Sequence, residues 1–153
     1  MALELRRVKN TFDMLFGKDV EVSDNAPLDI SPKTVIGTFK NGEENVCGAI
    51  IFDNSLACFS GAALSMIPMG AAEDCIASGE ISSAIMDNVN EVFNVSVGFF
   101  SDGTTPDMRL DKIHVNEESV PENVTEIISN GSGLHFQANI QGYGTGSASV
   151  FML

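Results

Sequence analysis

The spacing of apolar residues in the first third of the chain predicts one helix followed by two strands. From Leu3 to Phe16, apolar residues recur every three or four positions, which places them on one side of a helix, and Gly17 is a typical helix end. Val35 to Lys40 and Val46 to Phe52 are rich in β-branched and aromatic residues. Because Asn41-Gly42 is a favoured turn pair, we expect these two runs to form a hairpin.

Two further helices are expected in the middle of the chain. Asn54 is predicted to cap a short helix over Ser55 to Met66 that ends before Pro68. Gly70 to Gly79 is interpreted as a connection, because small and polar residues dominate it. The longest helix is predicted from Glu80 to Val97 and is followed by a turn at Ser101 to Pro106.

The last third of the chain contains four β-like runs with glycine-rich turns between them. The runs are Met108 to Val115, Val124 to Ser129, Leu134 to Ile140 and Ser147 to Leu153. The glycines at 142, 144 and 146 are interpreted as one turn. This order of helices and strands predicts an α+β fold with a largely antiparallel sheet, and no linker divides the chain, so we expect a single domain over residues 1–153.

A weak internal repeat is visible in the order of these elements. Asn10 to Gly17 precedes the hairpin at 35–52, as Asn90 to Gly98 precedes the runs at 134–153. Each half would then be one helix with its own hairpin.

The helix predicted at Glu80 to Val97 has two contrasting sides. Steps of three and four residues place Asp87, Glu91, Asn94 and Gly98 in one row. The opposite row holds the apolar positions and one serine: Ile81, Ile85, Val89, Val92 and Ser96, with Phe93 beside them. A polar row of this kind is ordinary on a surface helix, but asparagine is a poor helix former, and three asparagines stand inside this segment. The pattern therefore favours a functional role for the polar row.

Charge and cysteine content narrow the classes of function. The chain of 153 residues carries a net charge of −13, so it would be repelled by nucleic acid and by anionic membranes. Cys47, Cys58 and Cys75 are odd in number and form no CxxC pair, so we expect buried thiols and a cytoplasmic location. The run from Met1 to Arg7 has no apolar signal region, and no apolar run is long enough to span a membrane. His114 and His135 are interpreted as structural residues, and no metal site is expected on this chain.

The polar row resembles the signature of the CheC/CheX phosphatases of bacterial chemotaxis, which act on phosphorylated CheY. That signature is Ser or Asp, three residues, Glu, two residues, Asn, three residues and Gly, with a Pro after about 22 further residues counted from the Asn. Asp87, Glu91, Asn94 and Gly98 match its first four places. Glu117 stands where the proline is expected, and Pro121 lies about four positions later. A second register, through Ser83, Asp87 and Asn90, satisfies a relaxed form of the motif.

The resemblance implies a CheC-like α+β fold and hydrolysis of the aspartyl phosphate of a CheY-like response regulator. By that resemblance Glu91 would pair with a lysine of the receiver domain, while Asp87 and Gly98 would contact the partner. Asn94 would hold the attacking water, a task that suits a carboxamide because it offers both a donor and an acceptor. The receiver would supply its own Mg²⁺, and this chain would carry no cofactor. A homodimer is expected, because one helix alone carries the motif.

The alternative hypothesis is a non-catalytic relative that binds a receiver domain or dimerises without hydrolysing anything. The missing proline and the doubled register favour this alternative, while the intact Glu91 and Asn94 favour the phosphatase.

Overall fold

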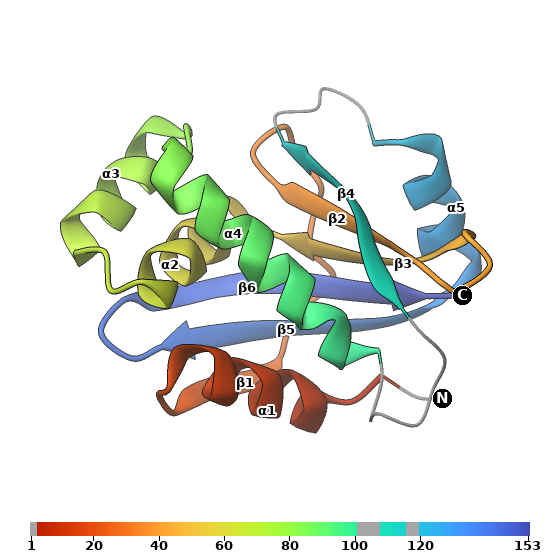
Figure 1. The fold of residues 1–153 in the computed structure, drawn as a ribbon, viewed down its shortest axis with the longest axis horizontal. Coiled ribbons are helices and arrows are strands. Elements are labelled where there is room, and N and C mark those ends of the chain that lie inside the picture. The colour runs from red at the N-terminus through yellow and green to blue at the C-terminus, as the bar shows by residue number, and fades with distance from the viewer. Residues whose placement is uncertain (1–2, 101–107, 116–119) are drawn as a thin grey trace.

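The computed structural model describes residues 3–100, 108–115 and 120–153, which form one six-stranded sheet with helices on both faces (Figure 1). The first half contains α1 (Leu5–Phe16), β1 (Val20–Asp24), β2 (Val35–Lys40), β3 (Val46–Phe52), α2 (Asn54–Leu64) and α3 (Met69–Ser78). The second half contains α4 (Ser83–Val95), the 3₁₀ helix η1 (Ser96–Phe99), β4 (Arg109–Val115), α5 (Glu122–Asn130), β5 (Ser132–Ile140) and β6 (Gly144–Met152). The architecture confirms the predicted α+β class.

The strand order is β1-β5-β6-β3-β2-β4, and every pair of neighbours is antiparallel. This order reads the same when the two halves of the chain are exchanged, because β1 then replaces β4, β2 replaces β5 and β3 replaces β6. The helices obey the same exchange, since α1 precedes the first set of strands and α4 precedes the second. The topology therefore agrees with the predicted helix-plus-hairpin repeat.

The central strands are buried on both faces. In β3, Ile50 and Phe52 belong to the large core under α1, α2 and α4, whereas Ala49 and Ile51 belong to a smaller core under α5. This alternation follows from the period of two residues along a strand. The large core is built around phenylalanine rings, and Phe12 of α1 lies within 5.4 Å of Phe99 and 6.3 Å of Phe52 between ring centres.

Most predicted elements are confirmed within a few residues. The helix at the N-terminus ends at Gly17 in the left-handed conformation, as expected, and the hairpin strands β2 and β3 have the predicted bounds. The strands predicted from 108, 134 and 147 are β4, β5 and β6. The turn predicted at 101–106 lies outside the described residues.

Three predictions of local structure are wrong. Val124–Ser129 belongs to helix α5, because Val124 and Ile127 lie three residues apart and both bury against the sheet. Residues 70–79, predicted as a connection, contain α3, in which Ala72 and Cys75 pack on α2. The predicted cap Asn54 is the first residue of α2, and the cap is Asp53, whose carboxylate accepts a hydrogen bond from the Leu56 amide at 2.8 Å. Strand β1 was not predicted at all.

The glycines after β5 do not form one turn. Gly142 has a φ of 87° and makes the turn, but Gly144 and Gly146 lie in β6 beneath α2. A Cβ atom on Gly146 would lie 2.4 Å from the Leu56 amide nitrogen. These glycines therefore let α2 rest directly on the sheet.

No helix in the described part of the chain is long and apolar enough to cross a membrane.

Candidate functional site

Helix α4 crosses the sheet on the side of the large core, and its own sequence fixes which side it buries (Figure 1). The Ser82 hydroxyl caps it by accepting a hydrogen bond from the Ile85 amide at 3.4 Å. Its buried side chains are Ile85, Val89, Val92 and Phe93, at three- and four-residue spacing. With Ser96 also buried and Ile81 half-buried, the predicted buried row of this helix is confirmed.

Close packing holds α4 against both its neighbouring helix and the sheet. A Cβ on Gly61 of α2 would lie 2.7 Å from Ile85 Cγ2 and 2.8 Å from Val89 Cγ2, so the two helices approach at a glycine. The Phe93 ring lies 4.6 Å from the Phe52 ring and directly over Gly37 of β2. Contacts this tight leave little freedom for α4 to rotate or slide.

Asn88 ties α4 to α2 through polar contacts. Its side-chain nitrogen donates to the Gly61 carbonyl at 2.8 Å and to the Ser65 hydroxyl at 2.7 Å. Carbonyls in the last turn of a helix have no partner within it, so Asn88 satisfies one that α2 leaves free. One of the three asparagines that disfavour this helix is thus explained by packing.

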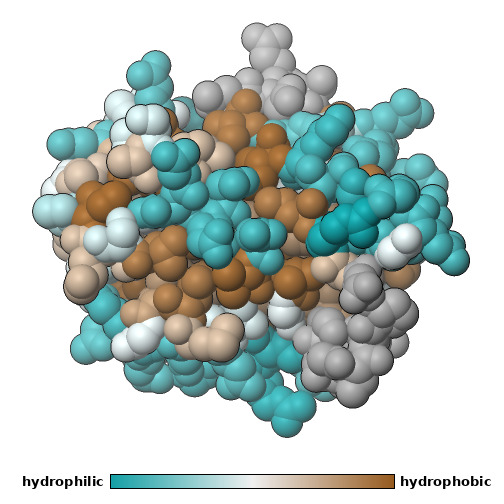
Figure 2. Space-filling model, in the orientation of Figure 1, coloured by the Kyte–Doolittle hydropathy of each residue, from teal (hydrophilic) through white to brown (hydrophobic). Residues whose placement is uncertain are grey.

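The predicted row projects away from the core. Asp87, Glu91 and Asn94 are all exposed on α4. Figure 2, in the orientation of Figure 1, shows hydrophilic side chains over the middle of this face with apolar surface on either side. Among the described residues none forms a hydrogen bond with the Asn94 side chain, and no ion pair joins Glu91 or Asp87 to a described cation. The acid and the amide are therefore available to a second molecule.

The other predicted positions have mixed surroundings. Ser83, Asp87 and Asn90 of the second register are exposed as well, so burial does not distinguish the two registers. Helix α4 ends at Val95 rather than Val97, and Gly98 lies in η1. A Cβ on Gly98 would lie 2.9 Å from the Thr11 hydroxyl, so this glycine permits close packing on α1. Its proposed contact with a partner stays a prediction.

Pro121 and Glu117 bear on the expected proline of the motif. Glu117 lies outside the described residues. Pro121 precedes α5, which packs on β3 and β6 in the smaller core, on the sheet face opposite to α4.

Helix α1, the counterpart of α4 in the repeat, presents a different surface. Lys9 lies 3.1 Å from the Asp13 carboxylate and 2.7 Å from that of Asp19. The Val20 amide donates to Asp13 at 2.8 Å and, with Lys9, holds the pKa of Asp13 below its usual value. The charges on this part of α1 are thus paired within the chain, whereas those on α4 are not.

The histidines and cysteines were tested against the remaining site types. His135 Nδ1 lies 2.8 Å from the Ser149 hydroxyl, consistent with a structural role. No group of three potential metal ligands occurs among the residues that the structure describes. The prediction of unpaired thiols is wrong for Cys58 and Cys75, which form a disulfide between α2 and α3. Cys47 is free, and burial raises the pKa of its thiol.

Sequence reasoning missed a hollow beside the disulfide. It has a volume of about 320 Å³ and lies at the N-terminal end of α4, lined by Ala71, Asp74, Cys75, Ser78, Glu80 and Ser82. A polar hollow of about 340 Å³ lies at the other helix, between Asp19, Glu21, Asn139 and Gln141. Neither hollow could be expected before α3 was known to be a helix and β1 a strand.

No protein-family model matches the sequence, and no curated protein matches it. Solved structures match along nearly the whole chain. The CheX–CheY–BeF₃–Mg²⁺ complex from Borrelia burgdorferi contains a chain similar over 99% of both lengths, at 12% identity and a TM-score of 0.51. A CheC-like superfamily protein from Shewanella is 14% identical over 97% of this chain and 94% of its own, with a TM-score of 0.55. The FliM middle domain from Helicobacter pylori is 13% identical over 97% and 84%, with a TM-score of 0.60. The fold is therefore the CheC/CheX-like fold, which FliM shares.

Proposed function

We propose that this chain is a phosphatase that hydrolyses the aspartyl phosphate of a CheY-like receiver domain. One observation carries the proposal: an acid and a carboxamide, Glu91 and Asn94, stand exposed one turn apart on a helix whose opposite side is locked into the core. The complex of the similar Borrelia CheX with CheY supports the choice of partner. The exposed row is narrow and projecting, which suits insertion into another protein's site.

An acyl phosphate is already reactive, so the main task left to this chain is orientation. A water must approach phosphorus in line with the scissile P–O bond, and positioning of this kind can supply much of the rate enhancement. The Asn94 carboxamide can accept one hydrogen bond from that water while its NH₂ group donates to a neighbouring oxygen. The Mg²⁺ of the receiver neutralises phosphoryl charge when bound, and no metal is assigned to this chain.

Glu91 is assigned to docking rather than to proton transfer. It lies three residues before Asn94 on the exposed side of α4, where its carboxylate can form an ion pair with a lysine of the receiver. Such a pair fixes the rotation of the helix about its own axis and so fixes the direction of the amide. Asp87, one turn earlier, extends the acidic contact, and the net charge of −13 favours a basic patch on the partner.

The competing function is a binding module without hydrolysis. The similarity to FliM favours it, since FliM structures of the same fold were solved in complexes with FliG and with SpeE. A protein of that kind needs only the exposed surface of α4 and not the amide of Asn94.

We further propose a homodimer and a cytoplasmic location. The edge strands of the described sheet are β1 and β4, and their outer backbone groups can pair with a second copy.

The test is the dephosphorylation rate of CheY-like receivers, charged with acetyl phosphate, with and without this protein. Substitution Asn94→Ala should lower stimulated turnover about 10² to 10³-fold, as removal of one oriented polar group from a preorganised site does. Its binding to a receiver carrying beryllofluoride should stay within a few-fold of the parent.

Asn90→Ala is the matched control, because it removes the same side chain from the same helix one turn away. Full activity of Asn90→Ala beside an inactive Asn94→Ala assigns the first register, and the reverse result assigns the second. A parent protein that binds receivers without accelerating phosphate loss would overturn the phosphatase and leave the binding module.

A further inference from the structure

The Cys58–Cys75 disulfide is the main covalent restraint on α3, the least buried helix beside the functional surface. Cys58 lies in α2 and is fully buried, while Cys75 lies in α3 and is 5% exposed. Apart from Cys75, Ala72 is the only residue of α3 that is buried. The helix packs on α2, and its polar tie to α2 is the hydrogen bond from Asn54 Nδ2 to the Ile76 carbonyl at 3.3 Å. A helix with so little buried surface depends strongly on its crosslink.

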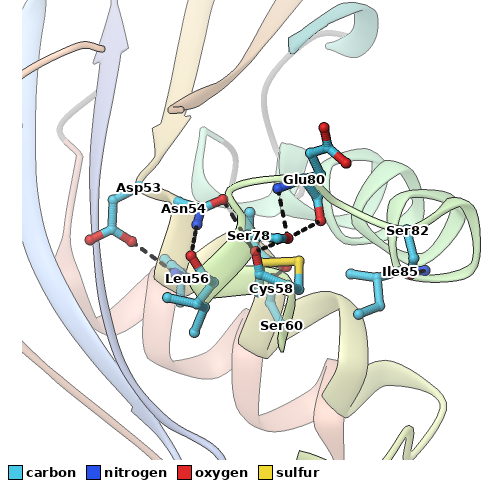
Figure 3. The surroundings of a disulfide bond; sticks show 12 residues. Asp53, Asn54, Leu56, Cys58, Ser60, Ser78, Glu80, Ser82 and Ile85 are labelled. Atoms are coloured by element: carbon cyan, nitrogen blue, oxygen red, sulfur yellow. Dashed lines mark hydrogen bonds between the residues drawn. A yellow bond between two sulfur atoms is a disulfide. The ribbon is translucent and has the colours of Figure 1, made fainter. Parts of the chain in front are cut away.

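We propose that this disulfide is a reversible lock on α3 whose reduction loosens α3 and the first turn of α4. Figure 3 shows the short path between the two helices. The Ser78 hydroxyl donates to the Cys75 carbonyl and accepts from the Glu80 amide, and the chain then reaches Ser82, the cap of α4. When α3 is released, nothing in this path holds the cap in place except α4 itself.

A second path runs through α2. Ser65, whose hydroxyl accepts from Asn88 of α4, stands at the end of α2, directly before the segment that leads into α3. Release of α3 frees this segment and weakens the exposed half of the Asn88 tie. The Gly61 carbonyl is buried within α2 and keeps its bond. Val89, Val92 and Phe93 stay anchored, so Glu91 and Asn94 keep their places.

The position of Cys75 gives a reductant access. Its sulfur lines the hollow of about 320 Å³ at the start of α4. A dithiol reductant can attack Cys75 Sγ as a thiolate, so that the S–S bond breaks, Cys58 Sγ leaves as a thiolate and takes up a proton, and a mixed disulfide forms. The second thiol of the reductant then displaces Cys75 Sγ, which also takes up a proton, and the reductant ends as a disulfide. In a reducing compartment a bond of this kind is regulatory rather than permanent.

The consequence for function rests on the proposed activity. Asp87 lies just beyond the first turn of α4, at the edge of the loosened part, while Asn94 lies beyond it. Reduction should therefore weaken receiver binding by roughly fivefold, since the loosened turn must be ordered on binding, and should leave turnover at saturation unchanged.

The experiment compares the oxidised full-length protein with protein held in dithiothreitol, by amide hydrogen exchange. The crosslink spans 17 residues of chain, enough to shift an opening equilibrium by on the order of a hundredfold. We expect exchange in Met69–Ser78 to become at least tenfold faster on reduction, with the first turn of α4 also faster and β5 and β6 unchanged. Cys47→Ser should respond in the same way, which excludes the free thiol as the cause.

Unchanged exchange in α3 would overturn the lock, and so would an equal rise in exchange across the whole sheet, because the bond would then staple the fold as a whole. The variant Cys58→Ala with Cys75→Ala should match the reduced parent, and the parent in dithiothreitol gives the answer if that variant does not fold. Binding of a beryllofluoride-loaded receiver reads the functional effect without any hydrolysis. Altered α3 exchange without any receiver binding would leave the lock standing and remove the proposed function alone.

Discussion

Replacing Asn88 by alanine tests whether this asparagine is present for packing rather than for function. The side chain donates to the Gly61 carbonyl at 2.8 Å and to the Ser65 hydroxyl at 2.7 Å. In a regular helix end the Ser65 amide would approach Gly61, but here it approaches the Ala63 carbonyl. Without Asn88, the Gly61 carbonyl is left inside the α2–α4 contact without a partner.

The size of the effect follows from two opposing contributions. Each of the two neutral hydrogen bonds contributes about 1 kcal/mol, and an unsatisfied buried carbonyl adds to the loss, so the cost is about 2 kcal/mol. Alanine is a better helix former than asparagine by roughly 0.6 kcal/mol, which offsets part of that cost. Asn90→Ala gains the same propensity but removes an exposed side chain. The difference between the two variants therefore isolates the contact, at about 2 kcal/mol.

Thermal and urea unfolding of the two variants give the measurement. For a chain of this length the difference corresponds to a melting temperature of Asn88→Ala about 4 to 8 °C below that of Asn90→Ala. Both variants should keep Glu91 and Asn94 in place and remain active against a phosphorylated receiver. Equal melting temperatures would show that Asn88 contributes nothing to the packing of α4, and the structural reason for that asparagine would be lost.

Two further predictions concern α2. Burial raises the pKa of the capping Asp53 carboxyl, so this group favours the folded state at low pH and its contribution is lost as pH rises from about 3.8 through the raised value; Asp53→Asn keeps the cap, and its stability relative to the parent should increase with pH across that window in urea titrations, whereas a constant difference would contradict the assignment. Gly146→Ala places a Cβ 2.4 Å from the Leu56 amide nitrogen and should cost about 3 kcal/mol of unfolding free energy, while Gly42→Ala, whose Cβ meets nothing within 4 Å, should leave the unfolding midpoint unchanged.

The elements that the sequence predicts correctly are those whose pattern repeats. Helix α4 buries the four positions that its spacing selects, and the hairpin of β2 and β3 follows from two apolar runs around Asn41-Gly42. The errors come from short segments in which tertiary contacts override local preference. Val124 to Ser129 is rich in β-branched residues, yet one face of it fits the small core as a helix. In β1 the alternation of Val20 and Val22 is too short to be distinctive.

The site shows the same division between pattern and distance. The exposure of Asp87, Glu91 and Asn94 follows from helical period alone. The disulfide could not be predicted, because it depends on α3 folding back onto α2, which brings Cys58 and Cys75 to a Cα separation of 6.2 Å. Asn88 was grouped with the functional asparagines because its partners, Gly61 and Ser65, lie far from it in sequence.

The repeat explains why one helix of this fold carries the functional row and the other does not. Exchange of the two halves maps the sheet onto itself, so α1 and α4 occupy corresponding places in the topology. On α1, Lys9 is held by Asp13 and Asp19 and is unavailable to a partner, whereas on α4 the acids and the amide project without a described partner. A duplicated fold needs both helices for its core but only one for binding. The second can therefore use its polar residues to fix the start of β1, as the Asp13 contact with the Val20 amide does.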